Sequence, residues 1–150
     1  MENKKEKAIN AFKSGYNCAQ SVVVAFAETL NFDEKTALST SVGFGGGMGR
    51  LQETCGAVTG AFMVLGLHNS AKYTDNLTLK NATYSMVRKF DAKFKSIHST
   101  TNCKALIQCD LNSDEGHAYA VENKLFEKIC EKCIVNAVDI LEELIAEKIS

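Results

Sequence analysis

The sequence predicts a single all-α domain, residues 1–150, folded as a bundle of about five to seven helices. The chain contains no proline, which favours long uninterrupted helices. Apolar residues recur at spacings of three and four along several segments, whereas the alternating pattern typical of strands is nearly absent. A chain of this length buries roughly 70% of its unfolded surface, so it can form a core without disulfide bonds.

The first half of the chain is expected to form three short helices followed by a glycine-rich loop. An amphipathic stretch over residues 8–12 ends near Gly15, which can adopt the left-handed conformation that closes a helix. Asn17 precedes a second helix, and Asp33 is the expected N-cap of a third helix that ends before residue 43. The apolar positions of the second helix are Cys18, Val22, Ala25, Phe26 and Leu30. Five glycines within residues 43–49 indicate a loop or a segment of close backbone approach.

The second half is expected to contain a buried central helix, a long amphipathic helix and a longer last helix. Residues 55–67 are apolar almost all round, which predicts the buried helix directly after the glycine-rich loop. Residues 77–97 form the next helix, and residues 103–106 form a short helical turn. One face of the helix over 77–97 carries Ala82, Met86, Phe90, Phe94 and Ile97. Gly116 is expected to open the connection into the last helix. The apolar stripe of that helix is Val121, Leu125, Ile129, Cys133, Ala137, Leu141, Leu144 and Ile145.

The charge balance and the apolar runs exclude several functional classes. Seventeen Lys and Arg against eighteen Asp and Glu give a net charge of -1, which argues against nucleic-acid binding through a positive field. The longest apolar run is shorter than the about 20 residues that a membrane-spanning helix needs. No apolar segment typical of a secretory signal follows the first residues. We therefore expect a cytoplasmic protein with no membrane insertion.

The glycine-rich segment does not have the pattern of a nucleotide site. A phosphate loop requires Lys and then Ser or Thr after its last glycine, but Arg50 and Leu51 follow Gly49. A dinucleotide fingerprint requires a preceding strand and a glycine at the position of Met48. Two interpretations remain: a tight loop between closely packed helices, or an anion-binding nest whose N–H groups face the cysteines.

Six cysteines in a chain expected to be cytoplasmic indicate metal binding or thiol chemistry rather than structural disulfides. Three of them follow residues that favour the N-cap: Cys18 after Asn17, Cys55 after Thr54, and Cys103 after Asn102. Each of these cysteines would then occupy the first helical position, where the helix dipole favours a thiolate. Gln20 would complete a capping box with the residue before Cys18.

The other three cysteines lie in the last third of the chain. Cys130 and Cys133 have the C-x-x-C spacing of redox motifs, but that motif is strong at a helix start after a strand, and this pair is expected in mid-helix. One of the two is therefore expected to be a core residue. Cys109 lies beyond the short helical turn, and the sequence leaves open whether Cys109 or Cys133 joins the site.

Three stretches of the chain together resemble a known family. They are GYNCAQSV at residues 15–22, GFGGGMGR at residues 43–50 and CGAVTG at residues 55–60. With Asn102-Cys103 and the segment from Cys130 through 137–143, they are similar to the C_GCAxxG_C_C family of redox-active proteins over about residues 15–144. The cysteine and glycine of the family name are exchanged here, because Cys55 precedes Gly56. The resemblance implies a redox role, with hallmark cysteines at Cys18, Cys55, Cys103 and Cys130.

The leading hypothesis is a redox protein in which these four cysteines form one site. Four thiolates are the usual ligand shell of an iron–sulfur centre or another soft metal, which would serve electron transfer; they would suit zinc equally. Backbone N–H groups near the thiols would donate to the anionic sulfurs and tune the centre. The candidate glycines for this role are Gly45, Gly46, Gly47 and Gly56.

Two further hypotheses keep the fold and change the chemistry. In the first, the site is metal-free and acts as a thiol–disulfide oxidoreductase or redox sensor, with Cys18 and Cys55 as the first candidate pair. In the second, the chain is a non-catalytic helical interaction module in which buried cysteines serve as small hydrophobic residues. The sequence leaves open whether the protein is an enzyme and which redox partner or substrate it meets. The apolar central helix and the long last helix are compatible with a homodimer.

Overall fold

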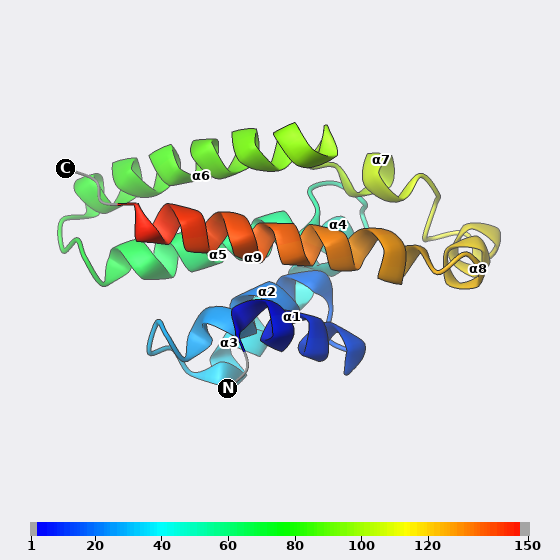
Figure 1. Ribbon diagram of the computed structural model, residues 1–150, viewed down its shortest axis with the longest axis horizontal. Coiled ribbons are helices and arrows are strands. Elements are labelled where there is room, and N and C mark those ends of the chain that lie inside the picture. The colour runs from blue at the N-terminus through cyan, green and yellow to red at the C-terminus, as the bar shows by residue number, and fades with distance from the viewer. Residues whose placement is uncertain (1–2, 148–150) are drawn as a thin grey trace.

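The computed structural model describes residues 3–147, and these form helices without a β-sheet (Figure 1). The elements are α1 (Lys4–Lys13), α2 (Cys18–Ala27), α3 (Glu34–Ser41), η1 (Val42–Phe44), α4 (Gly45–Met48), α5 (Gly56–Ser70), α6 (Asn76–His98), α7 (Cys103–Ile107), α8 (Asp114–Glu122), η2 (Phe126–Cys130) and α9 (Glu131–Ala146). The predicted all-α class is confirmed. The helices outnumber the expected five to seven, because the glycine-rich segment contributes α4 and the predicted last helix is divided into α8, η2 and α9.

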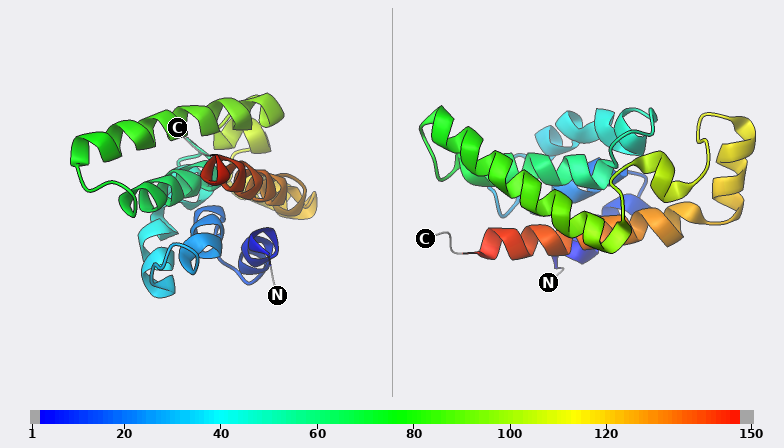
Figure 2. Two further views of the ribbon diagram at one scale, coloured as in Figure 1. Left: turned by 60° about the vertical axis from the view of Figure 1, so that its left-hand side comes forward. Right: turned by 90° about the horizontal axis from the view of Figure 1, so that it is seen from above.

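Three helices run along the long axis of the molecule and carry the core. α5, α6 and α9 lie side by side, α1 to α3 cover one side of them, and α7 and α8 extend at one end (Figures 1 and 2). The largest fully buried side chains include Phe26, Leu65, Phe90, Phe94, Ile134 and Leu141. Full burial of a side chain of this size stabilises the fold by roughly 1.5–3 kcal/mol. In the described part of the chain, no helix is both long and apolar enough to cross a membrane.

Most helix ends follow the capping chemistry expected from the sequence. The Asn17 side chain accepts the Gln20 N–H at 2.9 Å, and the Gln20 side chain accepts the Asn17 N–H at 3.0 Å, which completes the predicted capping box of α2. Asp33 caps α3 as predicted, by accepting the Thr36 N–H at 2.9 Å. Gly15, with a φ of 107°, follows α1. These caps fix where α2 starts, and Cys18 is its first residue.

The prediction of one long last helix starting near Val121 was wrong. α8 ends at Glu122, and Lys124 has a φ of 54°, so the chain turns there before η2 and α9 begin. Val121 is 57% exposed and does not share the buried stripe of α9. Gly116, predicted in the connection, lies inside α8, where its N–H bonds to the Ser113 hydroxyl that caps the helix.

The apolar face predicted for α6 is wrong at its last residue. Met86, Phe90 and Phe94 are buried as expected, whereas Ile97 is 54% exposed. The helix continues to His98, past the end of its apolar neighbours, and the His98 ring lies against Phe94 with ring centroids 4.5 Å apart. The apolar spacing therefore predicted the helix, but not the point along it where packing against the other helices ends.

Close packing of α2 against α5 depends on a small residue at position 60. A methyl group on Gly60 would lie 2.9 Å from the Ala19 carbonyl oxygen and 3.2 Å from its Cα, both backbone atoms that cannot move aside independently. Gly66, one and a half turns further along α5, has open space at the same point.

Gly60→Ala is therefore expected to destabilise the protein by about 1–3 kcal/mol, because α2 must move away from α5. Gly66→Ala is the matched control. It is expected to stabilise the protein by about 0.5–1 kcal/mol, because glycine is a poor helix former and nothing obstructs the added methyl. Chemical denaturation of both variants measures the two effects, and equal effects would contradict the close approach.

Candidate functional site

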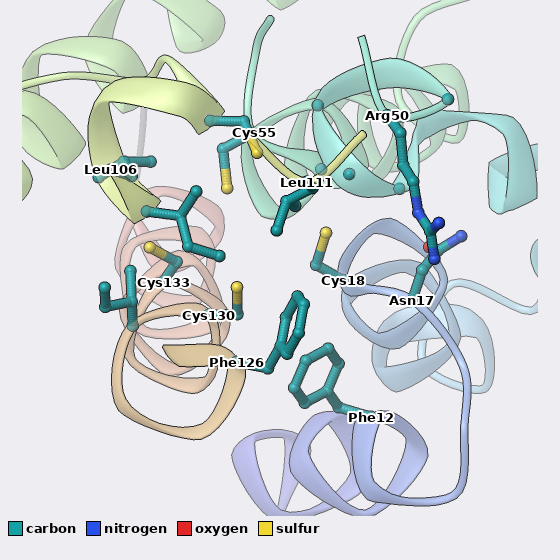
Figure 3. A pocket seen from close by; sticks show the side chains of 18 of the residues that line it. Phe12, Asn17, Cys18, Arg50, Cys55, Leu106, Leu111, Phe126, Cys130 and Cys133 are labelled. Atoms are coloured by element: carbon teal, nitrogen blue, oxygen red, sulfur yellow. The ribbon is translucent and has the colours of Figure 1, made fainter. Parts of the chain in front are cut away.

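A cavity of about 340 Å³ lies where α2, α4, α5, α7 and η2 meet (Figure 3). Five of the six cysteines line it: Cys18, Cys55, Cys103, Cys130 and Cys133. Much of the remaining wall is apolar and includes Phe12, Leu106, Ile107, Leu111, Phe126 and Ile129. The structure thus brings the four cysteines singled out by the sequence around one cavity, and adds Cys133 to them.

Cys18 enters the cavity from the first turn of α2. Burial raises the pKa of its thiol to about 11, and the neighbouring Cys55 adds to the rise. The Gly46 and Ala19 N–H groups donate to the Cys18 sulfur and oppose the rise without cancelling it. Behind the thiol, a methyl group on Gly56 would collide with the Cys18 sulfur, so α5 begins with a residue that leaves room for it.

Cys55 and Cys103 are held together by a short antiparallel pairing of two loops. The Cys55 N–H donates to the Thr101 carbonyl at 2.7 Å, and the Cys103 N–H donates to the Glu53 carbonyl at 2.6 Å. Thr54 and Asn102 form the bridge between these two bonds. Backbone hydrogen bonds therefore hold two cysteines that are far apart in the sequence as neighbours.

Of the two residues predicted to cap the helices that start at Cys55 and Cys103, one does so and the other does not. Asn102 caps α7 as predicted, by accepting the Ala105 N–H at 2.9 Å, and Cys103 is the first residue of that helix. Thr54 does not cap α5: Cys55 itself is the N-cap, and Gly56 is the first helical residue. The pairing explains the difference, because Thr54 is held in the bridge with Asn102.

The glycine-rich segment forms a tight left-handed turn beside the thiols. Five consecutive residues from Gly46 to Arg50 have positive φ, between 63° and 70°. Two of them, Met48 and Arg50, are not glycine, and such backbone costs of order 1–3 kcal/mol per residue. The candidate glycines Gly45, Gly46, Gly47 and Gly56 all line the cavity. Among them, Gly46 supplies a backbone hydrogen bond to the Cys18 sulfur.

The electrostatics of the thiols differ from the expectation of stabilised thiolates. Ionisation of any one of Cys18, Cys55, Cys103 and Cys130 would be opposed by negative charge on each of the other three. Burial, reinforced by this repulsion, raises the pKa of Cys103 to about 12 and that of Cys130 still further. The helix dipoles at Cys18 and Cys103 were expected to lower the pKa, but removal from water outweighs them.

Cys130 and Cys133 both face the cavity from the start of the last helical segment. Cys130 ends the π-helical turn η2, and Cys133 lies in the first turn of α9. Cys133 is 1% exposed, which fits the expectation that one of the pair is a core residue. The Cys133 thiol also hydrogen-bonds to Cys55, and this bond is the largest cause that raises the pKa of Cys55 well above its usual value, ahead of burial. Cys109 packs instead against a separate small cluster around Leu111.

Sequence reasoning missed Gln52, a buried residue that bonds to segments beside the cavity. This side chain is 4% exposed; it donates to the Cys109 carbonyl at 2.9 Å and accepts the Leu111 N–H at 2.8 Å. It also hydrogen-bonds to the Cys103 thiol and lowers the pKa of that thiol against the effect of burial. A lone glutamine has no motif that could have identified it. Arg50, which lies beside Asn17 at the rim in Figure 3, was likewise noted only as a departure from a phosphate loop.

The thiols can be compared with the needs of a metal site. Their chemistry is that of a soft-metal ligand set, because thiolates bind iron–sulfur centres, zinc and copper(I). Over residues 3–147, however, no three His, Cys, Asp or Glu side chains are grouped closely enough to hold a metal ion. A single zinc ion with Zn–S distances of about 2.3 Å would require such a group. The four thiols surround a space larger than one ion occupies.

Comparison with known proteins identifies the family. The family model described as "Putative redox-active protein (C_GCAxxG_C_C)" matches residues 16–144. An uncharacterized protein of Archaeoglobus fulgidus is 27% identical over 109 residues, which cover 68% of this chain and 72% of that protein. No solved structure matches the chain. Because the family model spans most of the sequence and includes all five cysteines of the cavity, this chain belongs to the C_GCAxxG_C_C family.

Proposed function

We propose that the protein transfers electrons through an iron–sulfur centre, or another soft-metal centre, held by Cys18, Cys55, Cys103 and Cys130. The observation that carries this proposal is the convergence of four thiols from α2, α5, α7 and η2 on one largely apolar cavity. A cavity of about 340 Å³ has room for a polynuclear centre, in which metal and sulfide stand between widely spaced cysteines. Such a centre supplies reversible one-electron chemistry when it is bound.

The residues around the thiols support this role in two ways. Phe12, Leu111 and Phe126 line the cavity and keep water from the sulfur atoms. Backbone N–H groups of Gly46 and Ala19 donate to Cys18, and the first-turn N–H groups of α5 act in the same way on Cys55. Hydrogen bonds to thiolate sulfurs and the exclusion of solvent are the protein's main means of setting a redox potential.

The raised pKa of Cys18 favours a metal centre over metal-free exchange at this thiol. With a pKa of about 11, only roughly one Cys18 thiol in ten thousand is ionised at pH 7, and the thiolate is the form that attacks disulfides. Ionised together, the four thiols would repel one another in a largely apolar cavity. A bound metal supplies compensating positive charge and deprotonates coordinating thiols outright.

The test is to purify the full chain without oxygen and to measure its visible absorption, iron and acid-labile sulfide. We expect a brown protein with iron and sulfide in stoichiometric amounts, either as isolated or after anaerobic reconstitution with iron and sulfide. A colourless protein that stays free of iron after reconstitution would contradict the proposal. Stoichiometric zinc in its place would show a structural rather than a redox site.

The metal-free thiol–disulfide function is the second candidate, and one specific contact favours it. This contact is the hydrogen bond of Cys55 with Cys133, rather than the pairing of Cys55 with Cys18 that the sequence suggested first. The third hypothesis, a module with cysteines as small hydrophobic residues, gives no reason for five thiols to face one cavity. We therefore rank it last.

A further inference from the structure

Cys133 is a fifth thiol in the cavity and lies outside the four-cysteine set of the proposed centre. Its side chain is 1% exposed, and that of Cys55 is 8% exposed, so neither is a surface thiol. The two come from different helices that pack against each other, Cys55 from the N-cap of α5 and Cys133 from the first turn of α9. Both line the cavity, and Figure 3 labels both among its lining side chains.

The two thiols are already in contact. The side chain of Cys55 is hydrogen-bonded to Cys133, and it is this cysteine, not Cys130 one turn earlier, that Cys55 contacts in this way. A disulfide requires sulfur atoms about 2.05 Å apart and Cβ atoms about 3.5–4.5 Å apart. Because their side chains already interact where α5 packs on α9, Cys55 and Cys133 are the cysteines best placed to reach that geometry.

We propose that Cys55 and Cys133 form a second, two-electron redox couple in this cavity, a dithiol that small uncharged disulfides oxidise to an intramolecular disulfide. The chemistry balances in two exchange steps. One protein thiol loses its proton and attacks a sulfur of the small disulfide, which releases one small thiol and leaves a mixed disulfide. The second protein thiol then loses its proton, attacks the protein sulfur of the mixed disulfide and releases the second small thiol. The two cysteines are oxidised by two electrons, and one disulfide is reduced to two thiols.

The class of oxidant follows from the cavity. Its wall is largely apolar and its volume is about 340 Å³, so it admits a small uncharged molecule more readily than a large charged one. Burial of the carboxylates of glutathione disulfide among Phe12, Leu111 and Phe126 would cost several kcal/mol without paired charges. We therefore expect 2-hydroxyethyl disulfide to react and glutathione disulfide to react far more slowly.

This couple does not require the metal centre, although the two functions share Cys55. With Cys55 in a disulfide, one of the four thiols needed for the centre is absent. The two proposals can thus fail separately: the couple is tested in the metal-free chain, and the centre is tested by its absorption and metal content. Oxidation before reconstitution should also prevent iron from binding, and reduction should restore it.

The experiment treats the metal-free full chain with 2-hydroxyethyl disulfide, counts free thiols and maps the linked peptides by mass spectrometry. We expect two of the six thiols to be lost and a single link between Cys55 and Cys133. Cys133→Ala should remove this link, whereas Cys109→Ala, outside the cavity, should leave it unchanged. A link between Cys18 and Cys55, or six free thiols in the folded wild-type chain, would overturn the proposal.

If Cys133→Ala does not fold, the peptide map of the wild-type chain still shows which two cysteines are linked. The oxidant class has its own readout, the ratio of oxidation rates for the two disulfides at equal concentration. We expect 2-hydroxyethyl disulfide to react at least about tenfold faster, which corresponds to about 1.4 kcal/mol in the barrier. Equal rates would contradict the assignment of small uncharged disulfides.

Discussion

Replacement of Cys55 by serine is expected to abolish the bound centre while the protein stays folded. Cys55 interacts electrostatically with each of Cys18, Cys103 and Cys130, as these do with one another, so it lies near all three. A serine hydroxyl has nearly the same shape, but it is not a soft ligand and stays protonated at neutral pH. Cys55 is also the N-cap of α5, a position that serine suits better than cysteine.

The measurement is iron and sulfide content after anaerobic reconstitution, with circular dichroism to confirm helix content and melting temperature. Cys109→Ser is the matched control, because this cysteine packs outside the cavity and should retain the full centre. The expected result is loss of essentially all iron from Cys55→Ser and none from Cys109→Ser. Unchanged iron stoichiometry in Cys55→Ser would exclude a four-cysteine centre.

The sequence predicted correctly the helix starts and helices that depend only on residues close together in the chain. Asn17 and Asn102 cap α2 and α7 as predicted, because an N-cap depends on the side chain and the next three backbone N–H groups. The apolar periods of α2 and α6 predicted these helices for the same reason, since a buried face repeats within the helix itself. The all-round apolar character of residues 55–67 predicted α5. The positions of Cys18 and Cys103 at helix starts were thus predictable.

Features decided by distant segments could not be read in this way. Thr54 has the chemistry of a cap, but its pairing with Asn102 decides its role, and nothing local in residues 52–55 signals that partner. The raised pKa of Cys18 has the same origin, because burial by other elements outweighs the dipole of its own helix. Cys133 was expected as a core residue, and only the packing of α9 on α5 reveals its hydrogen bond to Cys55.

Gly47→Ala is expected to have the largest effect on stability near the site. Gly47 has a φ of 70°, which costs an alanine about 1–2 kcal/mol. Its added methyl would also lie 2.6 Å from Cys103 Cβ and 2.7 Å from Gln52 Cα, a position fixed by the backbone pairing of the two loops. Overpacking of this kind adds about 1–3 kcal/mol, so we expect a total loss of about 3 kcal/mol.

Gly47→Ala should also affect the proposed centre, because the Cys103 side chain must move to accommodate the added methyl group. Gly49→Ala separates backbone strain from collision: Gly49 has a φ of 63°, but its added methyl would meet only the Gly43 carbonyl oxygen at 3.6 Å, an ordinary contact. We expect Gly49→Ala to lose about 1–2 kcal/mol and to keep its centre. Gly47→Ala should lose more stability and most of its iron, as measured by urea denaturation and iron content. If both variants lose the same stability and keep the same iron, the left-handed turn does not position Cys103. Its strained backbone would then serve only to place the Gly46 N–H beside the Cys18 sulfur.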